Sequence, residues 1–512
     1  MAENGTGGVT RRDFIKIASV GGGGLVVGAL AGSQMFPKKV GSTGVPEKWD
    51  KEVDVVVVGG GGAGLAAAIS ANKEGAKVLV LEKMSGTLTS STAICGGFIT
   101  FCGTDIQKKN GINDSPDIFY KDILEYGEEA NPEVVRTYVD NTLAYYELIK
   151  SINVPIKDTV SPSPGCSVPR THTVDPAKHV QLLEKKARED GIEIMFKTPA
   201  KRLYYGAKKE VVGVKAESGG KEINIKARKA VILATGGFTH NSEMLNECIP
   251  GLGNVIALSC PGHTGDGHKI VFEAGCDMRG RPTIYTVQGM YPTSTTMEGY
   301  AEMFLYGAIQ VNKNGERYIN EDLYWCNKRT RAVLEQPKEN GIPILYQIID
   351  QKAFEKATKA GPPIGLGPNT TKLLIKADTI EELGKKIGAS KLKETVDQYN
   401  KDIDTVGYDT KFGRKTMVGP GTPKIEKIDK PPFYAFKNTA WLAYNPTTSF
   451  IVDKNLHPKN AFGEPIPRLY LVGEIMLRNV CGNHYIYGLA TGAGGALGLV
   501  AGKLAAKEEP LG

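Results

Sequence analysis

Three glycines and a glutamate near position 60 have the spacing that holds a nucleotide diphosphate. Gly59, Gly61 and Gly64 form Gly-x-Gly-x-x-Gly, and Glu82 follows 18 residues after the last glycine. In such a motif the first glycine makes a tight turn, the second lets a pyrophosphate approach the backbone, and the third lets a helix pack on a strand. The acid accepts hydrogen bonds from ribose hydroxyls. The spacing therefore predicts a dinucleotide site.

The segments around the motif predict the strand, turn and helix that this chemistry needs. Residues 53–58 are apolar and β-branched, which is typical of a buried parallel strand. Residues 65–74 are rich in alanine and predict a helix, whose N-terminus offers amide donors and a positive dipole end. Residues 78–81 predict a second strand that ends at Glu82. The alternative, a glycine-rich turn in an unrelated α/β protein, leaves this agreement unexplained.

Further blocks of small residues follow in a fixed order, at 90–97, at 230–238 and at 469–474 with 488–495. As a set, the blocks resemble the flavoprotein family of fumarate reductase, succinate dehydrogenase and 3-ketosteroid dehydrogenases, over roughly residues 50–506. The resemblance implies an α/β fold, with a Rossmann-like FAD-binding domain of the glutathione-reductase type and an inserted α+β capping domain. It also implies FAD as the cofactor.

The same resemblance implies which residues hold the cofactor. For the ADP half they are Gly59, Gly61, Gly64 and Glu82, with Gly62 and Ala63 in the same turn. For the flavin they are Lys83, Ser91, Thr92, Gly96 and Gly97. Further contacts are implied for Thr235, Gly236, Asp266, Glu474, Leu489 and Ala490, of which Glu474 would meet the ribityl chain.

The chain divides into four predicted parts: a signal and linker at 1–48, the first part of the FAD-binding domain at 49–280, a capping and substrate domain at 281–440, and the rest of the FAD-binding domain at 441–512. Within the cap, residues 309–321 predict a hairpin with Asn314-Gly315 at its turn. By resemblance, the cap would close over the flavin and exclude water from the reacting centre.

The first forty residues are typical of an export signal. Arg11-Arg12, Phe14 and Lys16 precede an uncharged stretch at 17–36, and the pattern resembles a twin-arginine signal. We expect an exported, periplasmic or extracytoplasmic protein, with no stable membrane span in the mature chain because the stretch is only weakly hydrophobic. The alternative is a basic, disordered N-terminus.

Charge and cysteine spacing exclude other classes of function. The net charge is +7 without a long basic block, so we expect no nucleic-acid partner. The eight cysteines include no Cys-x-x-Cys pair, so we expect no metal site and no c-type haem in this chain. Electrons must then come from, or leave to, a separate carrier.

Tyrosines replace the charged groups that fumarate reductases use. Tyr291 stands at the family's His, Trp325 at its proton-donating Arg, and Cys481 and Tyr485 at a later His and Arg. Tyr485-Ile486-Tyr487-Gly488 is similar to a 3-ketosteroid dehydrogenase signature. A phenol can polarise a ketone oxygen or carry a proton at carbon. The candidate catalytic residues are therefore Tyr485, Tyr291, Tyr487 and Tyr324.

The hypothesis is an exported FAD enzyme that moves hydride and proton across a C=C bond beside a carbonyl, in a small hydrophobic enone such as a 3-oxosteroid. A second hypothesis is a fumarate- or acrylate-type (urocanate-like) reductase of an enoate substrate, with Arg329 taking the lost charge. A third is a flavin-carrying electron-transfer or binding subunit without small-molecule turnover. The residues do not decide the direction of the reaction.

Overall fold

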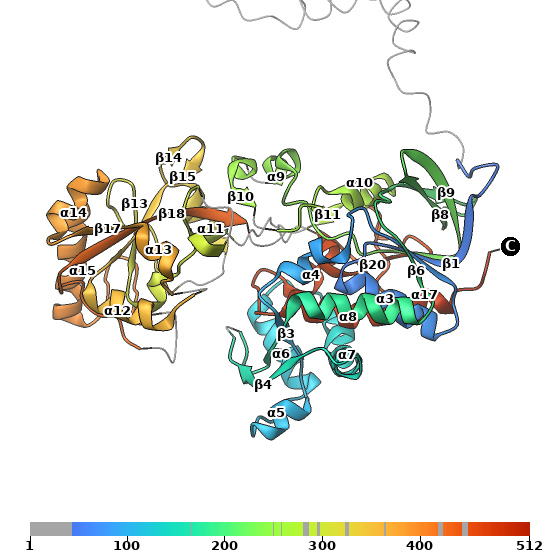
Figure 1. Cartoon of the computed structure of the whole chain (residues 1–512), viewed down its shortest axis with the longest axis horizontal. Coiled ribbons are helices and arrows are strands. Elements are labelled where there is room, and N and C mark those ends of the chain that lie inside the picture. The colour runs from blue at the N-terminus through green and yellow to red at the C-terminus, as the bar shows by residue number, and fades with distance from the viewer. Residues whose placement is uncertain are drawn as a thin grey trace, which may run out of the picture.

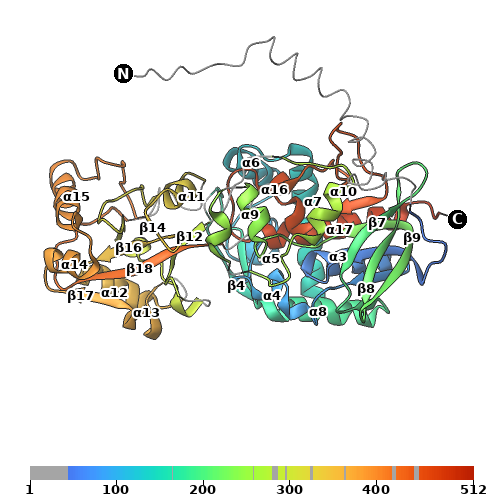
Figure 2. The same cartoon turned by 90° about the horizontal axis from the view of Figure 1, so that it is seen from above.

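A computed structural model describes residues 44–511, apart from 164, 249, 258, 280–285, 294–296, 323–326, 363–364, 418–422 and 443–448. The predicted twin-arginine segment, Tyr324 and Trp325 lie outside the described residues. Figures 1 and 2 show two bodies side by side, one built on each of two large sheets.

The first sheet forms around the predicted dinucleotide motif. β1 (Lys51–Val58) pairs in parallel with β2 (Val78–Leu81) and β9 (Lys221–Leu233), as the apolar runs predict. β1, β2 and the end of β9 are buried, which explains their continuous β-branched and aliphatic character. The other strands are β6 (Glu193–Met195), β20 (Leu469–Leu471), β8 (Val211–Ser218) and β7 (Ala200–Tyr205).

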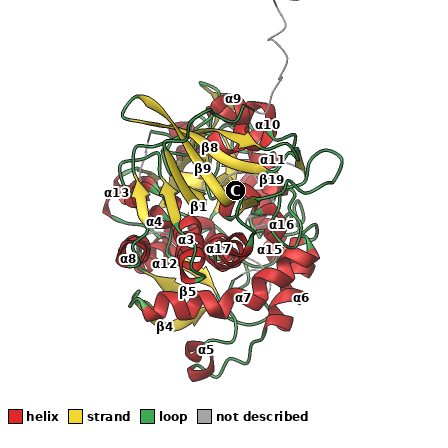
Figure 3. Ribbon diagram, turned by 90° about the vertical axis from the view of Figure 1, so that its right-hand side faces the viewer, coloured by secondary structure: helices red, strands yellow, loops and turns green. Residues whose placement is uncertain are grey.

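Two glycine-rich helices pack together under this sheet, as Figures 1 and 3 show for α3 (Gly62–Lys73) and α17 (Leu489–Lys507). A Cβ at Gly498 would lie 2.5 Å from the carbonyl oxygen of Ala63, and one at Gly502 would lie 2.2 Å from that of Ala67. Glycine at both positions is thus required for the close approach. α17 is the described helix that is long and apolar enough to cross a membrane, yet two thirds of its tested window is buried in the protein.

Additional elements extend the first body. They are α4 (Ser91–Ile94), β3 (Phe98–Thr100), α5 (Asp105–Lys109), α6 (Pro116–Gly127), α7 (Pro132–Ser151), β4 (Ile156–Ser161), β5 (Thr171–Val174), α8 (Pro176–Glu189) and α10 (Asp266–Glu273). Helices α6, α7 and α8 each begin with a side-chain cap followed by proline, which fixes where they start.

The second sheet is centred on β18 (Phe433–Leu442), which pairs with β16 (Leu345–Ile349), β17 (Leu374–Ala377), β12 (Thr286–Met290) and β10 (Ile256–Ala257). Around it lie α11 (Asn327–Leu334), α12 (Gln351–Ala360), α13 (Pro368–Lys372), α14 (Ile380–Ile387) and α15 (Leu392–Val406). β10 joins this sheet although it precedes residue 281, where the cap is predicted to begin. The domain boundaries at 280 and 440 stay a prediction.

The predicted hairpin at 309–321 is wrong in its second strand. β13 (Ile309–Asn312) pairs antiparallel with β16, and the return segment makes only an isolated bridge between Val311 and Arg317. The Asn-Gly turn itself forms, since the Asn312 amide donates to the Glu316 carbonyl at 2.9 Å. β13 is terminal in this sheet, and the Gln310 amide donates to the Glu321 carboxylate at 2.8 Å instead of to a strand backbone.

Candidate functional site

A cavity of about 870 Å³ lies at the carboxyl ends of β1, β2 and β9, where parallel sheets commonly bind ligands. Its walls come from segments far apart in the sequence. The described lining residues fall within 58–63, 81–84, 89–98, 234–236, 257–270, 300–302 and 473–494, with others at 145, 161–162, 171 and 198–200.

The glycine turn after β1 forms one wall. Gly59 has φ +113°, and a Cβ there would lie 2.3 Å from the Ala234 carbonyl oxygen. Gly61 is the N-cap residue of α3 and supplies no side chain, so the positive end of the helix dipole faces the cavity. Backbone and dipole thus present a surface suited to a diphosphate.

Glu82, at the end of β2, fixes this turn from the opposite side. Its carboxylate accepts from the Gly60 amide at 2.7 Å and from the Met84 amide at 2.7 Å, and it lines the cavity. An acid held by two amides at this edge is placed to accept from the hydroxyls of a ribose.

We expect Glu82→Ala to raise the dissociation constant for FAD about 10- to 100-fold, because hydrogen bonds to a charged group contribute roughly 1.5–3 kcal/mol. The measurement is titration of apoprotein with FAD, followed by flavin fluorescence. Glu74→Ala, at the exposed far end of α3, is the control and should bind FAD as the wild type does. An unchanged constant for Glu82→Ala would contradict this assignment.

A lysine and an aspartate meet at a second wall. Lys83 Nζ lies 2.8 Å from Asp266 Oδ2 and donates to Thr264 Oγ1 at 2.7 Å. Burial opposes the charge on Asp266, but the hydrogen bond and charge of Lys83 outweigh it, and the pKa of Asp266 is lowered. Lys83 is thus already engaged in an ion pair with Asp266.

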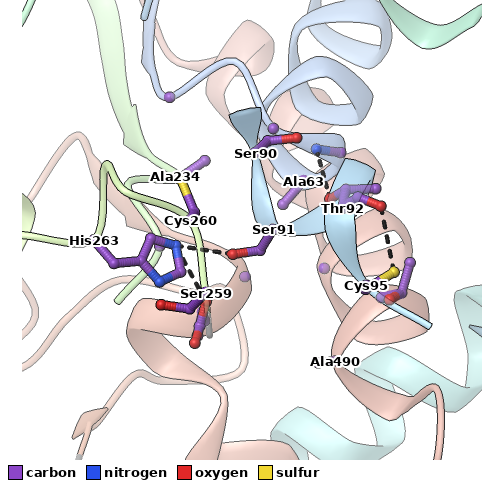
Figure 4. A pocket seen from close by; sticks show the side chains of 18 of the residues that line it. Ala63, Ser90, Ser91, Thr92, Cys95, Ala234, Ser259, Cys260, His263 and Ala490 are labelled. Atoms are coloured by element: carbon purple, nitrogen blue, oxygen red, sulfur yellow. Dashed lines mark hydrogen bonds and ion pairs between the residues drawn. The ribbon is translucent and has the colours of Figure 1, made fainter. Parts of the chain in front are cut away.

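His263 and Ser91 lie next to each other at the cavity in Figure 4, joined by a dashed line, with Thr92 and Cys95 on another side. A hydrogen bond of 2.9 Å joins Ser91 Oγ to His263 Nε2, and Glu474 Oε2 lies 3.5 Å from the same nitrogen. Burial lowers the pKa of His263, so the ring is neutral at pH 7. The sequence analysis did not select His263, although it noted the glycine-rich turn that carries it.

Two buried polar atoms at this wall support a polar ligand. His263 Nδ1 and Thr235 Oγ1 have no hydrogen-bond partner among the residues that the structure describes. Buried polar atoms are normally satisfied by protein, water or ligand. With the glycine turn, the held acid and the N-terminus of α3, these atoms fit a flavin dinucleotide, so the residues present suit FAD.

The other end of the cavity carries phenols and apolar groups. Tyr485 is 4% exposed, and its hydroxyl accepts from the Ala490 amide at 3.3 Å. The Tyr487 ring lies 6.0 Å from that of Phe98, centre to centre. Phe98 is thus at this end and is 40% exposed, and Ile94, which is 50% exposed, also lines the cavity. This end therefore suits a hydrophobic ligand with a polar group to be hydrogen-bonded.

A tyrosine–glutamate pair that the sequence analysis missed also lines the cavity. Tyr300 is 5% exposed and Glu302 is 1% exposed, and the Tyr300 hydroxyl donates to the Glu302 carboxylate. Burial and the adjacent Glu302 raise the pKa of Tyr300 well above its usual value. The sequence Tyr-Ala-Glu belongs to no motif, so only the fold reveals the pair.

The structure brings most of the predicted site residues to one cavity. Its lining includes Gly59, Gly61, Gly62, Ala63, Glu82, Lys83, Ser91, Thr92, Gly96, Thr235, Gly236, Asp266, Glu474, Tyr485, Tyr487 and Ala490. The other predicted residues that are described do not line it: Gly64, Gly97, Leu489 and Tyr291.

Those four residues contact the surrounding protein. A Cβ at Gly64 would lie 1.9 Å from the Gly59 carbonyl oxygen, and one at Gly97 would lie 2.3 Å from that of Val174, so both glycines serve packing. Leu489 is fully buried at the start of α17. The Tyr291 ring is partly buried and packs against a core cluster of the second body, 6.2 Å from Phe436. The structure therefore does not place Tyr291 at the cavity.

Comparisons with known proteins agree with this geometry. The family model described as FAD binding domain matches residues 54–494. The fumarate reductase (cytochrome) of Shewanella frigidimarina is 30% identical over 437 residues, covering 83% of this chain and 72% of that protein. The acrylate reductase flavoprotein subunit of Shewanella woodyi is 29% identical over 498 residues, covering 91% and 92%.

A solved structure shares the fold over most of the chain. The 3-ketosteroid-Δ4-(5α)-dehydrogenase from Rhodococcus jostii RHA1, in complex with 4-androstene-3,17-dione, superposes with a TM-score of 0.69 at 26% identity. The similarity covers 90% of this chain and 98% of that one.

Proposed function

Because this chain belongs to the FAD binding domain family and is an FAD-dependent oxidoreductase, we propose that it moves a hydride and a proton across a C=C bond conjugated to a neutral carbonyl. The substrate is a hydrophobic enone, such as a 3-oxosteroid. Bound FAD supplies or takes the hydride in this chemistry.

One observation carries the proposal: the cavity is charged at the dinucleotide end and phenolic and apolar at the other. Of the described residues that line it, Lys83 is the only lysine or arginine, and it is bonded to Asp266. A dicarboxylate needs bidentate cationic partners, and the buried carboxyl group of Glu302 would oppose a second anion. A neutral ligand meets neither difficulty.

The chain's own residues would bind the cofactor, polarise the substrate carbonyl and exclude water. The glycine turn and Glu82 hold the ADP half, and the His263–Ser91 pair and Glu474 contact the middle of the cofactor. Tyr485 accepts from the Ala490 amide, which polarises its O–H as a donor toward a developing enolate oxygen. Ile94 and Phe98 exclude water from the apolar face of the substrate.

A second candidate function is reduction of an enoate. Two relatives are named for fumarate and acrylate, and the charge of Arg329 acts on Tyr300 at the cavity, lowering its pKa. Arg329 is 3% exposed, with its guanidinium 4.3 Å from the centre of the Phe304 ring. In this alternative, Arg329 reaches the cavity and holds the carboxylate.

The test is anaerobic photoreduction of the flavin, then mixing with 4-androstene-3,17-dione, 1,4-androstadiene-3,17-dione, fumarate, acrylate and urocanate in separate runs. The expected result is fast flavin reoxidation by a steroid enone. Fast reoxidation by fumarate, with none by either enone, would overturn the proposal.

Arg329→Lys separates the two candidates, because lysine keeps the charge near Tyr300 and loses the bidentate geometry. For an enoate reductase, we expect kcat/KM to fall at least about 100-fold with acrylate or fumarate. For an enone enzyme, kcat/KM should change less than about tenfold. Steady-state kinetics with reduced methyl viologen as electron donor measure both.

The proposal includes export by the twin-arginine route and a separate electron carrier. Its support is the Arg11-Arg12 segment and the lack of a Cys-x-x-Cys-His haem motif in the sequence. Replacing both arginines with lysine should leave the protein in the cytoplasmic fraction, loaded with FAD. Unchanged export of that variant would contradict the route.

A further inference from the structure

We propose that Tyr300 and Glu302 form the proton relay of this site, in which Tyr300 exchanges a proton with a substrate carbon and Glu302 exchanges one with Tyr300. The inference rests on the proposed function only for the presence of a C=C substrate. Both side chains line the cavity, and their hydroxyl and carboxylate are hydrogen-bonded.

The backbone that carries the pair is fixed on both sides. Ala301, between the two residues, donates its amide to the Gly289 carbonyl at 3.0 Å, and its carbonyl accepts from Gln347 Nε2 at 2.7 Å. Gln347 Oε1 also accepts from the Phe304 amide at 3.3 Å, just after Glu302. Gln347 is fully buried on β16. The second sheet therefore holds the pair in a preorganised position.

Gly289 has a sequence requirement that follows from this contact. Its φ is +120°, and a Cβ there would lie 2.3 Å from the Ala301 carbonyl oxygen. Only glycine permits this approach, since both the conformation and the space exclude a side chain. The segment that carries Tyr300 and Glu302 therefore packs so closely on Gly289 that no side chain fits there.

The electrostatic surroundings explain why two residues are needed. Tyr300 is buried among Glu302, Tyr487 from the loop before α17, and Arg329 from α11. Burial, Glu302 and Tyr487 raise the pKa of Tyr300, and Arg329 lowers it by less. A phenolate beside a carboxylate would be costly there, so Tyr300 can release a proton only if Glu302 replaces it in the same event.

The step balances in protons and electrons. In the reducing direction, one alkene carbon receives the hydride, which brings both electrons, and the other carbon receives the Tyr300 proton. Before this step the Glu302 carboxylate has taken a proton from water, so its hydrogen bond with Tyr300 reverses and the Tyr300 O–H can donate to carbon. The Tyr300 O–H bond then breaks and re-forms with the proton of the Glu302 carboxyl group. The resulting Glu302 carboxylate then takes a proton from water. The oxidising direction reverses each transfer.

Other phenols are less suited to this role. Tyr485 is engaged with the Ala490 amide at the start of α17, and Tyr291 packs away from the cavity. The Tyr300 hydroxyl is hydrogen-bonded to the Glu302 carboxylate, and a carboxyl group is what would regenerate the acid.

The test compares Tyr300→Phe and Glu302→Gln with Tyr346→Phe, a control that changes a buried tyrosine of the second body outside the cavity. Photoreduced holoenzymes are mixed with 1,4-androstadiene-3,17-dione, and its dissociation constant is read from the flavin spectrum of the oxidised forms. We expect kcat to fall about 10²- to 10⁴-fold in both relay variants. The dissociation constant should stay within about threefold, and the control should match the wild type.

Chemical rescue distinguishes a relay from a structural role. In Glu302→Ala, added formate should restore at least about a tenth of the lost kcat, because a small acid can occupy the vacated space and return a proton. No rescue, or a loss found wholly in the dissociation constant, would overturn the relay.

Failure of the relay and failure of the proposed function give different results. If the wild type is reoxidised by fumarate and by neither enone, the proposed function fails, and the same variants are measured with fumarate. A loss of kcat with fumarate would then still support the relay. Turnover of none of the alkenes by the wild type would overturn both.

Discussion

Replacing Gly64 with alanine should leave the purified protein with less than about a tenth of its FAD. The added Cβ would lie 1.9 Å from the Gly59 carbonyl oxygen and 3.2 Å from the Ala234 Cβ. Relief requires α3 to move away from β1, because backbone atoms cannot step aside. The amides that face the diphosphate would move with the helix, so the cofactor is lost without a change in any group that lines the cavity.

The measurement is the ratio of flavin to protein absorbance after purification, with the FAD dissociation constant of the refilled protein. Gly86→Ala is the matched control, because Gly86 is extended at φ 178° and a Cβ there meets nothing within 4 Å. Normal flavin content in Gly64→Ala would show that the turn tolerates a wider separation of helix and strand.

Removing Arg317 should have the largest effect on stability. Arg317 is buried in the second body, 2.5 Å from Glu321 and 2.6 Å from Asp409. Arg317→Met leaves these carboxylates with one nearby described guanidinium, that of Arg414, 3.5 Å from Glu321. An uncompensated buried charge costs about 3–5 kcal/mol, so the free energy of unfolding should fall by that amount.

Denaturant unfolding of the holoenzyme, followed by tryptophan and flavin fluorescence, measures this loss. Lys393→Met is the control, since Lys393 forms an exposed pair with Asp397 on α15 and its loss should leave the midpoint unchanged. Equal midpoints for the two variants would contradict a buried role for Arg317.

The same cluster gives the second body a pH dependence. Burial opposes ionisation of Glu321, but Arg317 and Arg414 prevail and lower its pKa below the ordinary value of 4.5. A lowered carboxyl pKa contributes stability that is complete above 4.5 and is lost as the pH falls through the folded-state value. At pH values below 4.5, the denaturant midpoint of the wild type should therefore fall more steeply with pH than that of Glu321→Gln.

The dinucleotide half of the site could be predicted because its requirements are local. A tight turn, a helix start and an acid at a strand end are each set by residues close in the sequence, and Gly59, Gly61 and Glu82 all line the cavity. Gly64 follows the same logic, since it packs on the nearby Gly59 carbonyl, whereas Gly97 is required by a contact with Val174, which is distant in the sequence.

The substrate half could not be predicted in the same way, because long-range pairing decides it. Tyr300 and Glu302 reach the cavity through the contact of Ala301 with Gly289 and with Gln347 of β16. Tyr291, selected from its position in a motif, packs instead against a core cluster beside Phe436. Substitution at a motif position shows which group is lost and does not show which residue replaces it in space.

The contact between α3 and α17 also sets the order in which the protein can mature. α3 and α17 lie far apart in the sequence, yet Gly498 and Gly502 pack directly on the backbone of α3. Glu474, Gly488 and Ala490 complete the cavity wall from the same late segment. Domains gain structure as they leave the ribosome, N-terminal parts first. FAD can thus be fully enclosed only after the segment from Glu474 through α17 has been synthesised and has packed on α3.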